Sequence, residues 1–339
     1  MAVQILQVDV DDDIDVETIH RVDEAARIVD VPDFPARTLR EEQLALRHPS
    51  PGGAPRHFVA RVDGEPVGHL GLDLPQLDNT HVLEVDITVH PDRRREGIGR
   101  ALYEFAVDYA RTHDRNVLIG QYVTSRAADP GHSPGHAAFA EAVGATTALP
   151  EVRRRLDLAT VDADSWPGQL AAAAAHANGY TSITWVGDAP DDVVAEVARL
   201  EGRMVIDAPM GELKVEQEKY DADRIRGIEK SLRLRGRRHY HAAARHDATG
   251  ALAAWTMIAF DAETTSHAWQ QTTIVDPDHR GHRLGTIVKI ENLYLTRRHE
   301  PAVRYINTWN AASNQHMIAI NEALGFRVMD NWITWQHEL

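Results

Sequence analysis

The stretch from Val89 to Gly99 reads VHPDRRREGIG, and it decides the fold of the first half of the chain. A second stretch, from Val275 to Gly285, reads VDPDHRGHRLG and aligns with the first without a gap. The two copies share their Val, Pro, Asp, one Arg and the final Gly. Because an internal repeat indicates that one structural unit is used twice, the chain predicts two similar halves.

The residues around each copy follow one pattern. A hairpin comes first, with alternating apolar residues and a turn at Asp63-Gly64 in the first half and at Asp247–Gly250 in the second. A strand, the repeated stretch, a helix, a strand and a second helix then follow, and the helices show apolar residues at helical spacing. The expected segments are Arg56–Leu74, Val82–Val89, Ala101–Tyr109, Asn116–Val123 and Ala137–Val143, then His239–Phe260, His267–Val275, Ile287–Arg297, Val303–Trp309 and Asn314–Leu324.

This order of segments predicts an α+β or mixed α/β fold in two domains, residues 1–160 and 170–339. A chain of 339 residues suits two domains of middling size. We place the boundary at Thr160–Gln169, where TVDADSWPGQ is rich in turn and helix-breaking residues. The first domain then ends on the strand Glu151–Leu158.

The repeated stretch has the chemistry of a phosphate cradle. A helix start leaves backbone N–H groups unpaired and carries partial positive charge, so a phosphate binds there. Glycine allows close approach of the backbone, and arginine adds charged hydrogen bonds. A single Arg94-x-x-Gly97-x-Gly99 also fits a plain loop with helix-capping glycines. The strand before it, the helix after it and the second copy favour phosphate binding. The stretch lacks the G-x-G-x-x-G of dinucleotide sites and the G-K-[ST] of P-loops.

Composition excludes several classes of protein. The chain has no cysteine, so disulfides, thiolate metal sites and a cysteine nucleophile are ruled out, and a reducing cytoplasm fits. The formal net charge of −15 disfavours nucleic acid as a partner and favours a cationic small molecule. No apolar run approaches the ~18 residues that span a bilayer, so we expect no membrane partner.

Histidine is abundant, with 19 residues, and raises the question of a metal site. His239 and His241 can share a strand face, and His132 and His136 lie one helical turn apart. Neither pair has a third clustered ligand, so we expect no metal.

The chain resembles a tandem member of the GNAT acetyltransferase superfamily through these two stretches and their surroundings, over nearly its whole length. The resemblance implies two GNAT-like domains, each a mixed, mostly antiparallel sheet flanked by helices. In that superfamily R/Q-x-x-G-x-G/A binds the pyrophosphate of acetyl-coenzyme A, and the preceding strand pairs with the pantetheine arm. The layout is also similar to that of mycothiol synthase-like tandem acetyltransferases.

The resemblance implies cofactor-binding residues in both halves. In the first half they are Ile87, Val89, Arg94, Arg95, Gly97, Ile98, Gly99 and Arg100. In the second half they are Ile274, Val275, Arg280, Gly281, His282, Leu284, Gly285, Asn310 and Asn314. For Asn310 and Asn314 the alternative is strand-end turn chemistry and a helix N-cap.

The chain departs from the superfamily pattern at two places. Arg283 stands where the first half has Gly97, and its side chain either blocks close backbone approach or reaches the phosphates itself. Many members use a Tyr as general acid near the end of the last helix, and here those positions are Ala140 and Asn321. The mechanism therefore uses another acid, a water or none.

Acyl transfer to an amine needs a base to remove the proton from the amine. In the first half Glu84 and Asp86 lie two apart on the strand before the loop and share one face, so either is a candidate base. The alternative is a solvated strand face. The corresponding residues of the second half, Gln270 and Thr272, cannot act as bases, so we favour the first half for chemistry.

The expected function is N-acetyltransfer from acetyl-CoA to the amine of a small, unidentified acceptor by direct transfer. The alternative is a catalytically weak CoA-binding or interaction protein in which one or both domains are degenerate. A further alternative, aminoacyl transfer from charged tRNA, is disfavoured by the acidic charge and the intact loop.

Overall fold

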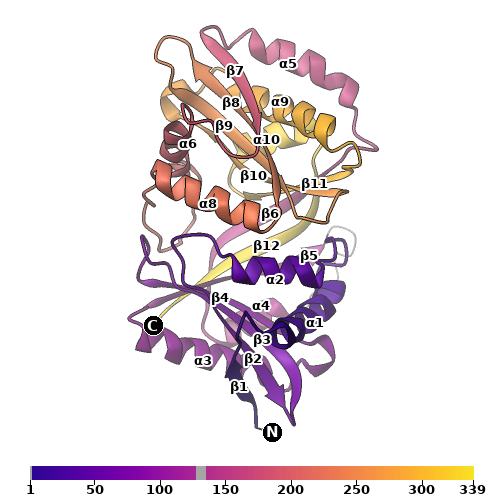
Figure 1. Ribbon diagram of the computed structural model, residues 1–339, viewed down its shortest axis with the longest axis vertical. Coiled ribbons are helices and arrows are strands. Elements are labelled where there is room, and N and C mark those ends of the chain that lie inside the picture. The colour runs from indigo at the N-terminus through magenta and orange to yellow at the C-terminus, as the bar shows by residue number, and fades with distance from the viewer. Residues whose placement is uncertain (1, 127–134) are drawn as a thin grey trace. The chain divides into compact units, whose positions relative to one another are not determined.

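The computed structural model describes residues 2–126 and 135–339, which it divides into two compact units (Figure 1). The N-terminal unit contains Met1–Glu151, Met210–Glu216 and Asp330–Leu339. The C-terminal unit contains Val152–Pro209 and Gln217–Met329. His132, half of one histidine pair named above, lies outside the described residues. No helix in the described ranges is long and apolar enough to cross a membrane.

The N-terminal unit is a mixed sheet with helices on both faces. Its strand order is β1-β2-β3-β4-β5-β12, and every pair is antiparallel except β4–β5. The elements are β1 (Gln4–Gln7), α1 (Asp13–Asp30), α2 (Leu39–Arg47), β2 (Arg56–Val62), β3 (Glu65–Asp73), β4 (Val82–Val89), η1 (Pro91–Arg93), α3 (Ile98–Thr112), β5 (Val117–Arg126), α4 (His136–Ala142), the start of β6 (Thr146–Asp157) and most of β12 (Arg327–Glu338).

The two faces of this sheet differ in character. Leu70 and Val85 lie on the face that packs on α3 and forms the main apolar core with Leu102. Residues alternate along a strand, so their neighbours point to the other face, where α1 packs against β3 and β4. That second face carries apolar Val59 beside Ile19 of α1, but it also carries the polar side chains described below.

The C-terminal unit repeats this plan. Its strands follow the order β11-β10-β9-β8-β7, with only β10–β11 parallel. Helix α9 packs on one face, and α6 and α8 form a core cluster with residues of the other face. The elements are the end of β6, η2 (Ala163–Ser165), α5 (Trp166–Ala174), β7 (Tyr180–Val186), α6 (Val194–Glu201), α7 (Met204–Asp207), α8 (Ala222–Leu234), β8 (Arg238–His246), β9 (Leu252–Phe260), β10 (His267–Val275), η3 (Pro277–His279), α9 (Leu284–His299), β11 (Tyr305–Ala311), α10 (Gln315–Leu324) and the start of β12.

The predicted fold class is confirmed, and so are both hairpins. The Asp63-Gly64 turn has positive φ at both residues, 50° and 84°, which matches the twist of the β2–β3 hairpin. Strands β4 and β10 have the predicted bounds. These segments were predictable because their patterns are local.

The chain is divided differently from the predicted ranges 1–160 and 170–339. Strand β6 changes unit after Glu151, and the last ten residues return to the N-terminal unit. The stretch Thr160–Gln169 is also more than a linker, because α5 begins inside it at Trp166. Pro167 lies in the first turn of α5, a position that suits proline. The indole of Trp166 is fully buried and donates to the Leu324 carbonyl at 3.3 Å.

Candidate functional site

The loop before α3 has the backbone of an anion site. Arg95 and Gly97 both adopt positive φ, 68° and 85°, and Gly97 is the N-cap of a 15-residue helix without a side-chain cap. A Cβ on Gly97 would meet nothing within 4 Å, so the space over the helix start is open. At Gly99, by contrast, a Cβ would lie 3.3 Å from the Phe139 ring and 3.6 Å from Val89, so this glycine serves close packing. Ile98 is buried in the core beneath the loop.

The side chain of Arg94 is hydrogen-bonded within the protein, and these bonds hold the loop in place. Its guanidinium donates two hydrogen bonds to Asp30, at 2.8 and 2.6 Å, and a third to the Val89 carbonyl at 3.2 Å. Asp30 is the last residue of α1. Arg95 on the loop and Arg100 in the first turn of α3 are exposed, so their positive charge remains available to a phosphate.

The loop before α9 has the same backbone with different side chains. Gly281 and Arg283 have φ of 88° and 54°, matching Arg95 and Gly97. Arg283 therefore adopts the left-handed backbone conformation that this loop has, although that conformation is unfavourable for a residue other than glycine. Arg280 is exposed and forms no ion pair within the described part of the chain.

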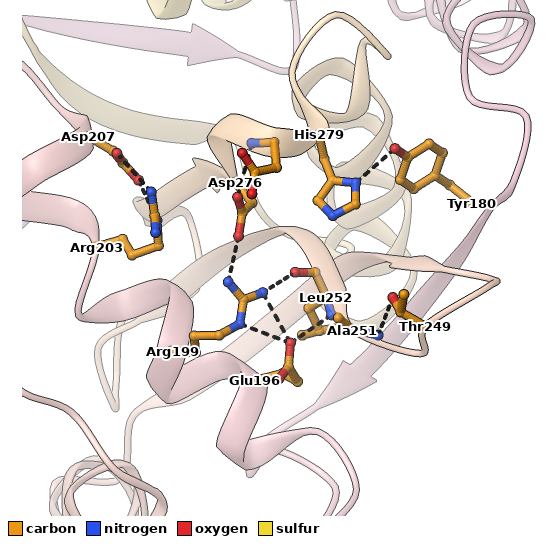
Figure 2. Close-up of polar contacts among 11 residues, drawn as sticks. Tyr180, Glu196, Arg199, Arg203, Asp207, Thr249, Ala251, Leu252, Asp276 and His279 are labelled. Carbon is orange, nitrogen blue, oxygen red and sulfur yellow. Dashed lines mark hydrogen bonds and ion pairs between the residues drawn. The ribbon is translucent and has the colours of Figure 1, made fainter.

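A salt bridge of reversed polarity holds this second loop, as Figure 2 shows. Arg199 of α6 donates to Asp276 at 2.5 Å and to the Leu252 carbonyl at 2.6 Å. Burial tends to raise the pKa of Asp276, but this ion pair and the hydrogen bonds hold it below its usual value. In the N-terminal unit the helix supplies the carboxylate of the ion pair, through Asp30 of α1. In the C-terminal unit the helix supplies the guanidinium, through Arg199 of α6.

Aromatic rings gather beside the second loop. The hydroxyl of Tyr180 and Nδ1 of His279 lie 2.9 Å apart, and the ring of Tyr180 lies 5.0 Å from that of His282 (Figure 2 shows the first pair). His282 also lies 3.0 Å, through Nδ1, from the His176 carbonyl. Leu284 and Gly285 are buried beneath the loop.

The strand residues predicted to meet the cofactor are placed differently in the two units. Ile87 and Val89 both pack against the α3 core and are partly buried. Ile274 belongs to the cluster with α6, whereas Val275 belongs to the cluster with α9, so these two point to opposite faces of the sheet.

The two asparagines of the C-terminal unit have hydrogen-bond partners inside the protein. Asn314 caps α10 by accepting from the Met317 N–H at 3.1 Å, as the capping alternative predicted. The Asn310 carbonyl accepts from the Asn321 amide at 2.7 Å, and Asn321 is fully buried. Asn321 therefore cannot act as a general acid in place of the missing Tyr.

Glu84 and Asp86 lie on the solvent-accessible part of β4, on the face that α1 packs against. Asp86 is exposed, yet the protein around it is dense enough that desolvation raises its pKa, with Asp23 adding to the rise. A carboxylate with a raised pKa is a better proton acceptor for an amine than a solvated one. Both residues remain candidate bases.

Sequence reasoning missed three residues beside Asp86. His69 of β3 places Nδ1 2.9 Å from a carboxylate oxygen of Asp23 in α1, and its Nε2 lies 3.1 Å from Nδ1 of His57 in β2. The register aligns His57 with Gly71, and Gly71 with Asp86. The only sequence signal was that both histidines fall on the polar side of the alternating hairpin strands.

In the C-terminal unit the position that corresponds to His57 is again a histidine, His241, but the residues around it differ. His241 pairs with Met257 in the register, and the Trp255 indole donates to Nδ1 of His241 at 3.2 Å. Thr272 donates to Glu201 of α6 at 3.2 Å, and burial raises the pKa of Glu201 to about 7. This unit therefore has a carboxylate that the sequence did not reveal.

His239 and His241 bond to each other, with 2.8 Å between Nδ1 and Nε2. Within residues 2–126 and 135–339 no group of three or more metal-ligating side chains lies together.

Comparisons with known proteins agree with this geometry. The model of the Acetyltransferase (GNAT) family matches residues 20–126. A solved tandem GNAT protein from the clavulanic acid biosynthesis pathway is 35% identical, with 99% of this chain and 98% of that chain covered and a TM-score of 0.83. The chain therefore belongs to the GNAT acetyltransferase family. Its two units match the tandem arrangement of that relative over nearly the whole length.

Other relatives support the family more narrowly. An uncharacterized N-acetyltransferase of Methanocaldococcus jannaschii is 38% identical over 65 residues, 18% of this chain and 29% of that protein. Another from Lactobacillus delbrueckii subsp. lactis is 31% identical over 94 residues, 26% of this chain and 53% of that protein. The chain thus spans at most about half of these curated relatives. A GCN5-related N-acetyltransferase structure from Sphaerobacter thermophilus, 18% identical with a TM-score of 0.65 and covered over 95% of its length, shares the fold.

Proposed function

We propose that this protein transfers the acetyl group of acetyl-CoA directly to the amine of a small acceptor, and that the N-terminal unit performs the chemistry. The observation that carries the proposal is the open helix start at Gly97. Its left-handed backbone, uncapped N–H groups and exposed Arg95 suit a pyrophosphate. The preceding strand, through Ile87 and Val89, would position the pantetheine arm.

The acceptor side also favours the N-terminal unit. The negative charges of Asp23 and Glu42 act on Asp86 of β4, and the positive charges of His69 and Arg37 offset part of their effect. A cationic amine suits this acidic surrounding, and the net charge of −15 favours its approach over that of a nucleic acid. Asp86 is the candidate base of this proposal. The absence of cysteine fits the reducing cytoplasm.

For the C-terminal unit a second function has specific support. Arg283 at the helix start and the rings of Tyr180, His279 and His282 crowd the second loop. These side chains favour a weaker or regulatory CoA site, or a structural role, for this unit. Arg280 and Arg283 would then meet the phosphates through side chains rather than backbone.

The test is calorimetric titration of acetyl-CoA into the wild type, Gly97→Glu and Arg283→Glu. These two residues occupy the same position of the two loops with the same backbone conformation, so the variants form a matched pair. We expect Gly97→Glu to weaken binding at least about tenfold, because a carboxylate at the helix start repels the pyrophosphate. We expect Arg283→Glu to leave the high-affinity site unchanged.

Gly97→Ala controls for backbone strain, because its Cβ meets open space and carries no charge. Loss of binding only in Arg283→Glu would move the cofactor to the C-terminal unit. A wild-type chain that binds no acetyl-CoA would refute the proposed function.

A further inference from the structure

Three side chains of the N-terminal unit form a hydrogen-bonded line that does not include the candidate bases Glu84 and Asp86. The line runs from Asp23 of α1 to His69 of β3 and on to His57 of β2, with heavy-atom distances of 2.9 and 3.1 Å. His69 is buried, whereas His57 is half-buried and Asp23 keeps 31% of its side chain exposed. The line therefore connects two partly exposed ends through a buried imidazole.

We propose that Asp23, His69 and His57 form a proton relay that takes the first proton of the acceptor amine in the N-terminal unit. The inference rests on the proposed function for its substrate and on the structure for its geometry, and it makes His57 rather than Asp86 the group that takes the first proton, which leaves Asp86 to attract the ammonium. Nε2 of His57 is the open end, because it has no hydrogen-bond partner among residues 2–126 and 135–339. Only a glycine, Gly71, separates His57 from Asp86 along the register.

The relay moves one proton and leaves the charge where it is stabilised. Nε2 of His57 accepts a proton from the acceptor ammonium, while Nδ1–H of His57 passes its proton to Nε2 of His69. His69, which already donates Nδ1–H to Asp23, becomes an imidazolium paired with that carboxylate. The freed amine lone pair attacks the thioester carbonyl and the C–S bond breaks. The second amine proton goes to the CoA thiolate. After product release, His69 passes its Nε2 proton back to Nδ1 of His57, and the Nε2–H of His57 gives its proton to solvent, which restores both neutral tautomers.

The charges around the line favour this direction. Burial lowers the pKa of His57 to about 4, with His69 adding to the fall, so the charge does not remain at the open end. Burial also opposes a charge on His69, but Asp23, and further away Asp86 and Glu42, raise its pKa above the usual value. The positive charge is therefore most stable on His69, beside Asp23.

The C-terminal unit provides an internal comparison. There Trp255 occupies the place of His69 and donates its indole N–H to Nδ1 of His241. An indole cannot accept a proton, so this hydrogen bond fixes the ring of His241 but cannot pass a proton on from it. The relay is thus specific to the unit with the open loop.

The test compares Asp23→Asn with Glu17→Gln in the full-length chain. Both changes convert a carboxylate of α1 to an amide, but Glu17 is exposed and lies outside the line. CoA release is followed with a thiol reagent, which has no background because the chain lacks cysteine, using spermidine and tyramine as amines. Affinity for acetyl-CoA is measured by calorimetry on the same samples.

We expect kcat of the wild type to rise with pH as His69 loses its proton and becomes able to accept one. In Asp23→Asn the pKa of His69 falls, so this rise should move to lower pH by about one unit or more, and the plateau should drop about tenfold to hundredfold. Glu17→Gln should match the wild type. His57→Gln should lower the plateau similarly, and the double variant should lose little more, since both residues serve one path.

An unchanged pH profile and plateau in Asp23→Asn, with turnover intact, would overturn the relay and leave the acetyltransferase standing. If the wild type binds no acetyl-CoA, the proposed function fails separately. Imidazole ¹⁵N shifts then decide the relay in the free protein. Coupled titration of His57 and His69 that changes in Asp23→Asn supports the relay, and independent titration of the two rings overturns it.

Discussion

At Gly71 the missing side chain leaves room for no more than a methyl group between His57 and Asp86. A Cβ there would lie 3.6 Å from Cβ of Asp86 and 3.8 Å from Nδ1 of His57, which is ordinary contact. In the C-terminal unit Met257 takes this register position opposite His241. A methionine side chain therefore stands in the C-terminal unit where the N-terminal unit has only a hydrogen atom.

We predict that Gly71→Met lowers kcat/KM for amines by about tenfold or more, because its side chain would stand between His57 and Asp86, where the proposed acceptor amine has to approach. Affinity for acetyl-CoA should be unchanged, since the loop at Gly97 is untouched. Steady-state CoA release and calorimetry measure the two quantities.

Gly71→Ala is the matched control and should keep turnover within about threefold, because its Cβ fits at van der Waals distance. Equal losses in the Ala and Met variants would show that the backbone, rather than the open space, matters at this position.

Among the elements, helix α9 of the C-terminal unit contains a buried lysine. Lys289 lies on its sheet-facing side with 1% of its surface exposed. Its Nζ lies 3.5 Å from the Thr273 hydroxyl and 5.5 Å from the centre of the Phe326 ring. Burial lowers the pKa of Lys289 to about 7, because the charged amine has lost its water.

We predict that Lys289→Met raises the free energy of unfolding at pH 7 by about 1–4 kcal/mol. The folded pKa lies below the unfolded one, so the folded state binds fewer protons between the two values. Wild-type stability should therefore rise from pH ~7 towards ~10.4, and the cost of the lysine is largest at and below pH 7. Urea unfolding across pH 6–10 measures this trend.

The exposed Lys230→Met of α8 serves as the control and should leave the pH dependence of stability unchanged. A Lys289→Met chain that keeps the wild-type rise with pH would assign that rise to other groups.

At the scale of the whole molecule, the main feature is that each compact unit is built from segments that are not consecutive in the chain. Asp330–Leu339 belongs to the N-terminal unit and pairs with β5 along its length. The Trp335 ring lies over Gly120, where a Cβ would come within 2.4 Å of it, and Tyr103 bonds to His337. The N-terminal sheet therefore depends on the last residues of the chain.

We predict that a chain truncated after Met329 loses acetyl-CoA binding at the N-terminal loop, although the deletion lies more than 200 residues from Gly97 in sequence. Removing β12 exposes β5 as an unpaired edge and uncovers the core beneath Trp335. Residues 1–160 alone should fail to fold for the same reason. Circular dichroism and calorimetry of the two fragments check this.

The full-length Trp335→Phe protein, which keeps the strand and a ring over Gly120, should retain binding with modest loss of stability. A truncated chain that binds acetyl-CoA as tightly as the wild type would mean that the N-terminal unit is complete without β12.

Much of the site was predictable from sequence, and the missing part has a common cause. The loop at Gly97 and the strand before it have the predicted backbone, because strand alternation and helix starts are local properties. The role of Asp86 as a base stays a prediction. The role of Arg94 as a link to Asp30 was missed, because the two residues lie 64 positions apart. Glu201 was missed because it reaches Thr272 from a different element, 71 residues away.

By itself the sequence determined the repeated strand–loop–helix, the fold class and the family, since hydrophobic period, turn glycines and helix starts act over a few residues. Only the tertiary structure decided which side chains meet on the α1 face, how each loop is held, and where the last strand lies. Asp23 and His69 are 46 residues apart, and Tyr103 and His337 are 234 apart. Such pairs form only when packing brings distant elements together, and no local pattern encodes them.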